Sequence, residues 1–397
     1  MMTLFSRMFS SFALCMIMLL CVVTARAAEK APVLVGLDGE LGLDGSFSAQ
    51  AIELGLRTAI VEINAAGGVL GGRPIELVSK DNRGVLARSV RNNAEFASMP
   101  NLVAVFGGRF SPSIIAQLPT LHEMKLPYLA VWSAGDPIID NGMQPNYVFR
   151  LSLRDSLAMP KLLKSAEQRG FDKVGLLLIN NSWGSSNLAA AEKYMLGVKN
   201  QQIVDIAWFN FKDPTLIKQY KKLTDAGAKA VLLVANDEGA ILVHEVAALP
   251  PSQRVPIISH WGITGGSFFK HTAAALQKVD LSVIQTFSFF TADKQMLARF
   301  MKTAAQTGGI KRIEDIRAPV GVAHAYDLMH ILAKAINLAH STERSAIRDA
   351  LEKVPEHQGL VKLYQPPFTP TRHEALGPEE LLMARFNREG VLVPVQK

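Results

Sequence analysis

Cysteine is nearly absent from this sequence. The 397 residues include two, Cys15 and Cys21, and both lie before residue 28. The segment around them has the three parts of a signal peptide: a positive residue at Arg7, an apolar run over 9–23 and an A-x-A cleavage motif ending at Ala27. The mature chain would then contain no cysteine, which excludes disulfides and thiolate metal sites.

The N-terminal segment also lacks the features of a membrane anchor. Its apolar run is shorter than the roughly 20 residues of a membrane-spanning helix, and the cleavage motif follows directly. A lipoprotein signal requires a small residue before its cysteine, whereas Leu20 precedes Cys21. We therefore expect a free protein that is exported to the periplasm of a Gram-negative bacterium and cleaved near Ala27.

Charged residues are few, at 19% of the chain, while 49% of the residues are hydrophobic. This composition is typical of a globular protein, and the length is sufficient for two domains. Without residues 1–27 the chain has 40 basic and 35 acidic residues, a formal charge of +5. The basic residues are scattered without long runs, so we expect a solvated surface and no nucleic-acid partner.

The sequence lacks the motifs of common enzymes. It contains no GxSxG, no GxxxxGK[ST] and no HExxH, and no GxGxxG follows the first expected strand. His244 and Glu245 fall on an expected helix without the second histidine that a zinc site needs. We therefore expect no catalytic residues, no metal and no cofactor.

Helix and strand periodicities alternate along the chain, which predicts an α/β protein with doubly wound, mostly parallel sheets. The C-terminal stretch 381–395 is expected to form a hairpin with its turn at 387–390. The expected strands are 33–37, 75–79, 102–106, 128–131, 174–179, 203–209, 230–234 and 255–259, and the expected helices are 49–63, 85–99, 112–124, 187–199, 216–225, 238–249 and 320–339.

The stretch 54–81, LGLRTAIVEINAAGGVLGGRPIELVSKD, completes the first β-α-β unit. Its first half has apolar residues at helical spacing, and Gly67-Gly68 then ends the helix, because glycine enters the left-handed C-cap conformation at little cost. The pattern favours helix termination over phosphate binding.

The strand, glycine-containing loop and helix that lead into INAAGGVLGGRPIEL resemble the periplasmic substrate-binding proteins of branched-chain amino acid ABC transporters. The resemblance implies the type I periplasmic binding-protein fold, with two lobes joined by three hinge strands. We place the crossings near 151, 286 and 361. The first lobe would then comprise 28–150 and 286–360, and the second 151–285 and 361–397. We expect a monomer.

Ligands of open α/β sheets bind beyond the carboxyl ends of the strands, so the residues after each strand are candidate ligand contacts. Ser111 stands before Pro112 at the start of a helix, where it could cap the helix or bind a carboxylate together with free backbone N–H groups. The resemblance implies the carboxylate role. It also implies that backbone groups of Ser133 and Gly135 contact the ligand's polar head, although a simple β-turn would explain this segment too.

In the expected second lobe, Trp183 stands where the family commonly has a tyrosine, and Asn236 and Asp237 follow the strand at 230–234. One position departs from the family. Amino-acid-binding relatives place an acid near residue 261 to pair with the ligand's ammonium group, whereas this chain has Trp261 beside His260. An amino-acid ligand would therefore require Asp237, Glu238 or Asp136 to take over that role.

Three of the four tryptophans, Trp132, Trp183 and Trp261, lie within four residues of expected strand ends. A single tryptophan there would indicate packing, but three from both lobes suggest aromatic walls for a flat ligand or a quaternary ammonium group. Phe47 could also face the cleft or could pack under the next helix. With Ser111 as the anion anchor, the expected ligand is a small carboxylate with an apolar or aromatic body, or an amino-acid-like molecule if one of those acids pairs with its ammonium group.

The sequence therefore predicts a periplasmic solute-binding protein that closes on a small molecule and delivers it to an inner-membrane ABC permease. An alternative is a ligand-sensing or accessory subunit of the same fold that acts on a receptor or a periplasmic redox system. A hydrolase or dehydrogenase would need a nucleophile-base pair or a dinucleotide loop, and neither is found.

Overall fold

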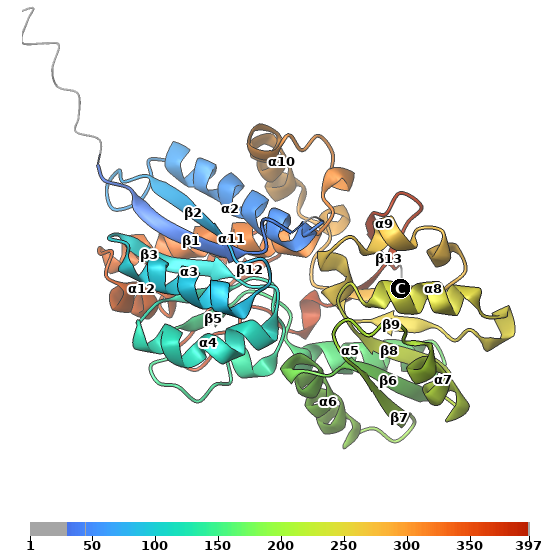
Figure 1. Cartoon of the computed structure of the whole chain (residues 1–397). Coiled ribbons are helices and arrows are strands. Elements are labelled where there is room, and N and C mark those ends of the chain that lie inside the picture. The colour runs from blue at the N-terminus through green and yellow to red at the C-terminus, as the bar shows by residue number, and fades with distance from the viewer. Residues whose placement is uncertain (1–29, 44, 396–397) are drawn as a thin grey trace, which may run out of the picture.

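The computed structural model describes residues 30–43 and 45–395, so the expected signal peptide lies outside the described residues. Two sheets organise the chain (Figure 1). The first has the strand order β2-β1-β3-β4-β5, and all its neighbouring strands are parallel. These strands are β1 (Val33–Gly39), β2 (Ile75–Asp81), β3 (Leu102–Gly107), β4 (Tyr128–Ala130) and β5 (Val148–Arg150).

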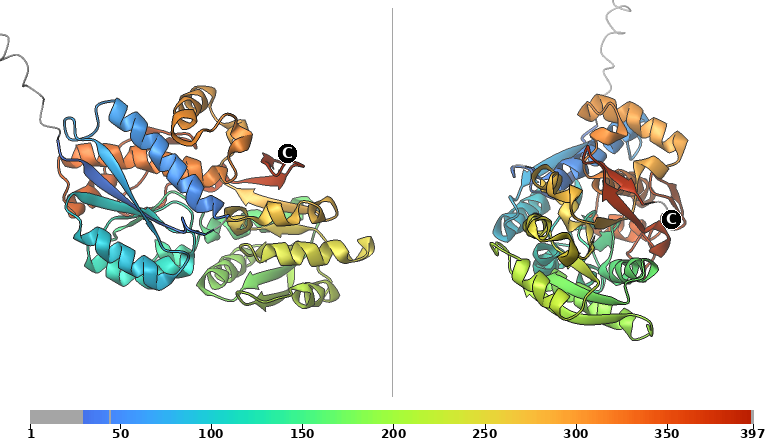
Figure 2. Two further views of the ribbon diagram at one scale, coloured as in Figure 1. Left: turned by 45° about the horizontal axis from the view of Figure 1, so that its top comes forward. Right: turned by 90° about the vertical axis from the view of Figure 1, so that its right-hand side faces the viewer.

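Helices cover both faces of the first sheet, as in a doubly wound fold. In Figures 1 and 2, α2 and α11 lie on one face, and α3 and α4 lie on the other. Gly55 of α2 permits close packing on α11, because a Cβ there would lie 2.3 Å from the main-chain oxygen of Val322. The helices are α2 (Phe47–Ala65), α3 (Leu86–Ser98), α4 (Ser111–Glu123) and α11 (Pro319–Ala339), with α12 (Arg344–Leu351) beside α11.

The second sheet has seven strands in the order β14-β13-β10-β9-β8-β6-β7. Its core is parallel, and the C-terminal hairpin adds two antiparallel strands at one edge, as predicted. The strands are β6 (Lys173–Ile179), β7 (Gln202–Phe209), β8 (Ala230–Val234), β9 (Ile257–Ser259), β10 (Leu281–Gln285), β13 (Leu382–Phe386) and β14 (Leu392–Pro394). The main helices are α5 (Asp155–Gln168), α6 (Ser182–Met195), α7 (Ile217–Asp225) and α8 (Gly239–Ala248). We refer to the parts built on the two sheets as the first and second lobes.

Buried polar contacts hold the segments that connect the lobes. The guanidinium of Arg150 at the end of β5 is fully buried, and its Nε donates to Glu374 Oε2 at 2.9 Å. Asp327 of α11 accepts hydrogen bonds from the backbone N–H groups of Leu360 and Val361 at 2.6 and 2.9 Å. Segments distant in sequence are therefore tied together beside the predicted crossings.

The sequence predictions differ from the structure in two respects. The helix expected at 187–199 begins at Ser182, because the Asn181 side chain accepts the N–H groups of Trp183 and Gly184 and caps it there. The second difference is a set of elements that the sequence patterns did not indicate, among them β5, β10, α5, which contains Pro160, α10 (Lys294–Gly308) and α12. No helix among the described residues is both long and apolar enough to span a membrane.

Candidate functional site

The central cavity lies between the lobes, beyond the carboxyl ends of strands from both sheets. Its volume is about 40 Å³, well below the roughly 300–1,000 Å³ of small-molecule sites, so an organic ligand would require the lobes to move apart. Five of the predicted ligand contacts line it: Ser111, Trp132, Trp183, Asn236 and Trp261. The other lining residues are Arg109, Phe110, Pro112, Ala134, Asn181 and Gly262.

Hydrogen bonds join two loops of the first lobe, one with Ser111 after β3 and one with Ser133 and Gly135 after β4, but of these three predicted contacts the cavity lining includes Ser111 alone. The N–H of Gly135 donates to Ser111 Oγ at 3.1 Å, and Ser133 Oγ donates to the carbonyl of Gly108 at 2.6 Å. Ser111 is the first residue of α4, and Phe110 occupies the cap position before it, so Ser111 does not have the cap role that its place before Pro112 suggested. Because Ser111 Oγ accepts from Gly135, its own proton remains available to a ligand oxygen.

Arg109 is the residue that sequence reasoning missed on this wall. Its side chain is 4% exposed, and its Nε has no hydrogen-bond partner among the described residues. One guanidinium nitrogen lies 3.3 Å from Asp237 Oδ2 of the second lobe. Of the described residues lining the central cavity, Arg109 is the only charged one, and Asp237 and Glu40 lie close enough to its guanidinium to offset part of that charge. The sequence feature that could have indicated Arg109 is its position two residues after the end of β3.

Two predicted tryptophans pack against each other across the cleft. The ring centroids of Trp132 and Trp261 are 5.6 Å apart, with an interplanar angle of 36°. Each residue is 1% exposed. Trp261 also lies 5.8 Å from the ring of His324, whose pKa is lowered by burial to about 4, so that this imidazole is neutral near pH 7. The paired rings therefore form one aromatic wall of the cavity.

Trp183 is fixed by a buried carboxylate that sequence reasoning also missed. Its Nε1 donates to Asp155 Oδ1 at 3.1 Å, and its ring meets His260 edge to face at 4.9 Å. His260 Nε2 lies 3.2 Å from the same oxygen of Asp155. A Cβ at Gly262 would lie 2.6 Å from the Trp183 ring, so the glycine allows the backbone to approach the indole closely. This network orients the indole in the second-lobe wall.

The three acids considered as ammonium partners are all engaged elsewhere. Asp237 pairs with Arg109. Glu238 accepts the N–H of Asn236 at 3.1 Å, and burial raises the pKa of its carboxyl group. Asp136 accepts from the hydroxyl and N–H of Ser156, and burial together with nearby Asp155 raises its pKa. None of these three acids lines the central cavity.

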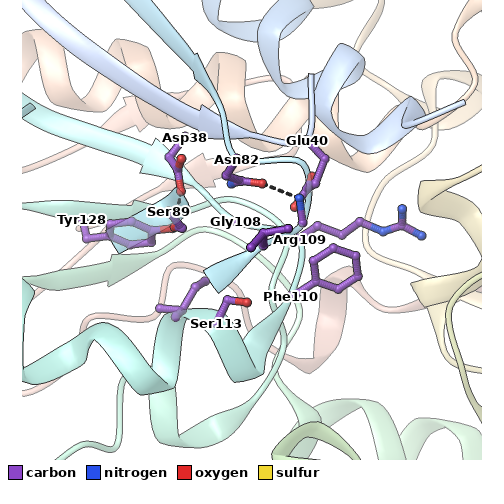
Figure 3. Close-up of a pocket in the computed structure, with 12 residues that line it drawn as sticks. Asp38, Glu40, Asn82, Ser89, Gly108, Arg109, Phe110, Ser113 and Tyr128 are labelled. Carbon is purple, nitrogen blue, oxygen red and sulfur yellow. Dashed lines mark hydrogen bonds between the residues drawn. The ribbon is translucent and has the colours of Figure 1, made fainter. Parts of the chain in front are cut away.

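A smaller cavity lies behind the β3–α4 loop, and Arg109 and Phe110 line both spaces. Figure 3 shows Asp38 and Glu40 there, with the Arg109 side chain extending away from Asp38. Burial raises the pKa of both carboxyl groups. At about 10 Å³ this cavity has room for roughly one water molecule, which is too little for an organic ligand.

Phe47, the remaining predicted contact, is half-buried and lines two other cavities instead of the central one, one between the lobes and one within the first lobe. It is the first residue of α2, and it shares the cavity between the lobes with Ile263 and Phe269 of the second lobe.

Two α/β lobes with a cavity between the carboxyl ends of their strands are the architecture of type I periplasmic binding proteins. The chain belongs to the periplasmic binding protein family, whose sequence model matches residues 30–387. Among curated proteins it is 30% identical over 180 residues to Leu/Ile/Val-binding protein homolog 8 of Brucella abortus. That match covers 42% of this chain and 41% of the relative's length.

Solved structures share the fold at lower identity. A type 1 periplasmic binding protein from Bordetella pertussis has a TM-score of 0.79 at 18% identity, covering 92% of this chain and all of its own. LivJ of Streptococcus pneumoniae, in complex with isoleucine, has a TM-score of 0.74 at 19% identity over the same shares. A solute-binding protein of R. palustris in complex with 4-hydroxybenzoate has a TM-score of 0.75 at 16% identity, covering 92% of this chain and 96% of its own.

Proposed function

We propose that this protein is the periplasmic solute-binding component of an ABC transporter and that it binds a small carboxylate with an apolar or aromatic body. The observation that carries the proposal is that Arg109 and Ser111 line the first-lobe wall of the central cavity, and Trp183 and Trp261 of the second lobe line the same cavity. A buried guanidinium and a hydroxyl are suitable donors for a carboxylate.

The charges around the cavity argue against an α-amino acid. An ammonium group would lie beside Arg109, and the acids that could neutralise it already have other partners. Placing a second cation in such a site without a paired carboxylate is costly. The ligand class is therefore closer to the 4-hydroxybenzoate of the R. palustris protein than to the isoleucine of LivJ.

The expected partner is an inner-membrane permease that recognises the closed form, and no covalent chemistry is required. We expect the mature protein to be periplasmic and monomeric, with hinges near 151, 286 and 361. A ligand-sensing subunit with the same site remains the second candidate, because the two functions differ only in the partner.

A thermal-shift screen of the mature protein tests the ligand class. The panel contains aromatic acids, short aliphatic acids, leucine and other amino acids, and quaternary amines. Binding to the folded state raises the melting temperature by linkage. We expect shifts with one or more of the acids and none with amino acids or amines, and we expect R109Q and S111A to remove them.

A shift with leucine that survives R109Q would overturn the carboxylate proposal, as would silence across all the acids. Neighbouring permease and ATPase genes would support transport over sensing.

A further inference from the structure

A second space lies apart from the central cavity. It consists of two adjoining cavities: the first, of about 240 Å³, lies between the lobes, and the second, of about 290 Å³, lies within the first lobe beside α2 and α10. Phe47 and Arg317 line both. We call this space the lateral groove. Together its two parts fall within the size range of small-molecule sites, roughly 300–1,000 Å³. Its remaining lining residues are Ile263, Thr264, Gly266, Phe269, Lys270, Phe386, Glu389 and Gly390 in the first part, and Gln50, Ala51, Leu54, Gly308, Ile310, Asp315, Ile316, Ala318 and Val322 in the second.

The aromatic wall divides the lateral groove from the central cavity. The 3₁₀ turn η3 (Trp261–Gly265) has residues on both sides: Trp261 lines the central cavity and Ile263 lines the groove. On the first lobe, Trp132 packs onto Gly321, where a Cβ would lie 3.1 Å from the indole and 3.2 Å from Ala51 of the groove. The groove is therefore not a branch of the Arg109 site.

The lining of the groove is mostly apolar, and both lobes contribute to it. The rings of Phe269 and Phe386 lie 5.6 Å apart on the second lobe, and Phe47 comes from the first. A molecule bound here would contact both lobes at once. Aromatic and aliphatic walls of this kind accept an alkyl chain or a flat ring by burial of apolar surface.

The charged residues of the first part of the groove, between the lobes, leave one positive charge in excess. In the first part, Lys270 and Arg317 stand with a single acid, Glu389. Arg317 donates to the main-chain carbonyl of Glu389 at 3.1 Å, which leaves its charge without a carboxylate partner among the described residues. In the second part, the carboxylate of Asp315 accepts the N–H groups of Lys311 and Arg312 in its own loop.

From this apolar lining with its excess cation we infer that the lateral groove is a second binding site, for an amphipathic monocarboxylate such as a medium-chain alkanoate. The chain would lie among Phe47, Phe269 and Phe386, and the carboxylate would be held by Lys270 and Arg317. Occupancy joins the lobes at a place separate from the transport site.

Titration of the mature protein with sodium octanoate by isothermal calorimetry tests this inference, with 1-octanol and octylammonium as probes of the same length. We expect octanoate to bind more tightly than either. The double variant K270Q/R317Q should weaken octanoate binding about tenfold through loss of charge-assisted hydrogen bonds, with little effect on 1-octanol. F386A should weaken all three probes. R388Q is the matched control. It also removes a positive charge, in the hairpin turn at 387–390 beside Glu389 but outside the groove lining, and it should leave binding unchanged.

Variants of the central cavity separate this inference from the proposed function. In R109Q and in S111A, the component of octanoate binding that K270Q/R317Q weakens should remain, and K270Q/R317Q should leave the thermal shift with the central ligand unchanged. The inference is overturned if octanoate does not bind, if R109Q removes its binding while K270Q/R317Q does not, or if K270Q/R317Q weakens 1-octanol equally.

Discussion

The two walls of the central cavity differ in what they present to a ligand. The first lobe supplies a charge and hydrogen-bond donors, through Arg109 and Ser111, on the loop that leads into α4. The second lobe supplies aromatic and amide surface, through Trp183, Asn236 and Trp261. Trp132 is the first lobe's contribution to the aromatic side. The division suggests that the first lobe captures the anionic head and that the second lobe selects the shape of the ligand body.

The largest expected effect comes from removing the indole that joins the two walls. Trp132 is 1% exposed and packs on both Trp261 and Gly321. W132A should lower the free energy of unfolding by about 3–5 kcal/mol, because it leaves a cavity in a dry interface. Urea denaturation measures the change. W208A, at a half-buried position of β7, is the control. An equal loss of stability in W208A would contradict the prediction that the packing of Trp132 between the lobes makes its removal more costly.

The next effect concerns Asp327 of α11, which holds the segment at 360–361 by hydrogen bonds. Burial raises the pKa of Asp327 to about 7, despite its hydrogen bonds from Leu360, Val361 and Tyr364. The folded state therefore holds this proton more tightly than the unfolded state does. The stability that depends on the proton is complete below about pH 4 and is lost as the pH rises through 7, by at most ~4 kcal/mol.

Urea denaturation between pH 4 and 8 measures this slope. D327N should flatten it, whereas D225N on the surface of α7 should not. A wild-type stability that rises steadily over this range, with the same slope in D327N, would contradict the assignment.

Removing the charge of Arg109 should lower the affinity for acids without changing their order of preference, which we assign to the second lobe. R109Q should weaken binding of the acid identified in the thermal-shift screen by about 10- to 100-fold, the value of a hydrogen bond to a charged group. W261A should instead change the ranking of aromatic and aliphatic acids. R91Q, on the exposed face of α3, is the control. If R109Q changed only the ranking, the assignment of roles to the two walls would be reversed.

The smallest effect is expected at the ion pair between the walls. Asp237 is 53% exposed, and its contact with Arg109 is one bond of 3.3 Å. Because the carboxylate is open to solvent, screening weakens the pair, and we expect the contribution of a surface ion pair, about 0–1 kcal/mol. D237N should therefore change acid affinity by no more than about fivefold, and calorimetry of the same acid measures it. A loss as large as that of R109Q would mean that Asp237 positions the guanidinium.

Strong local patterns made most of the fold predictable. The strand at 230–234 is apolar throughout, and the predicted and observed bounds agree. The glycines after Ile63 marked the end of α2, and the turn at 387–390 marked the hairpin. Pro160 obscured α5, since an internal proline normally argues against a helix.

The site was predictable to the extent that it follows strand ends. Ser111, Trp132, Trp183, Asn236 and Trp261 all stand there, and all line the central cavity. Arg109 and Asp155 could not be assigned, because their roles depend on which buried groups surround them. Phe47 could not be assigned either, because its direction is set by how α2 meets the second lobe.

The contact between Trp132 and Trp261 gives this protein a built-in optical reporter. Their indoles belong to different lobes, with centroids 5.6 Å apart, and transitions of rings at that spacing couple to each other. The near-ultraviolet circular dichroism of the pair therefore depends on the spacing between the lobes. Opening of the cleft can be followed in the unlabelled protein as the loss of this signal, with W132F as the blank.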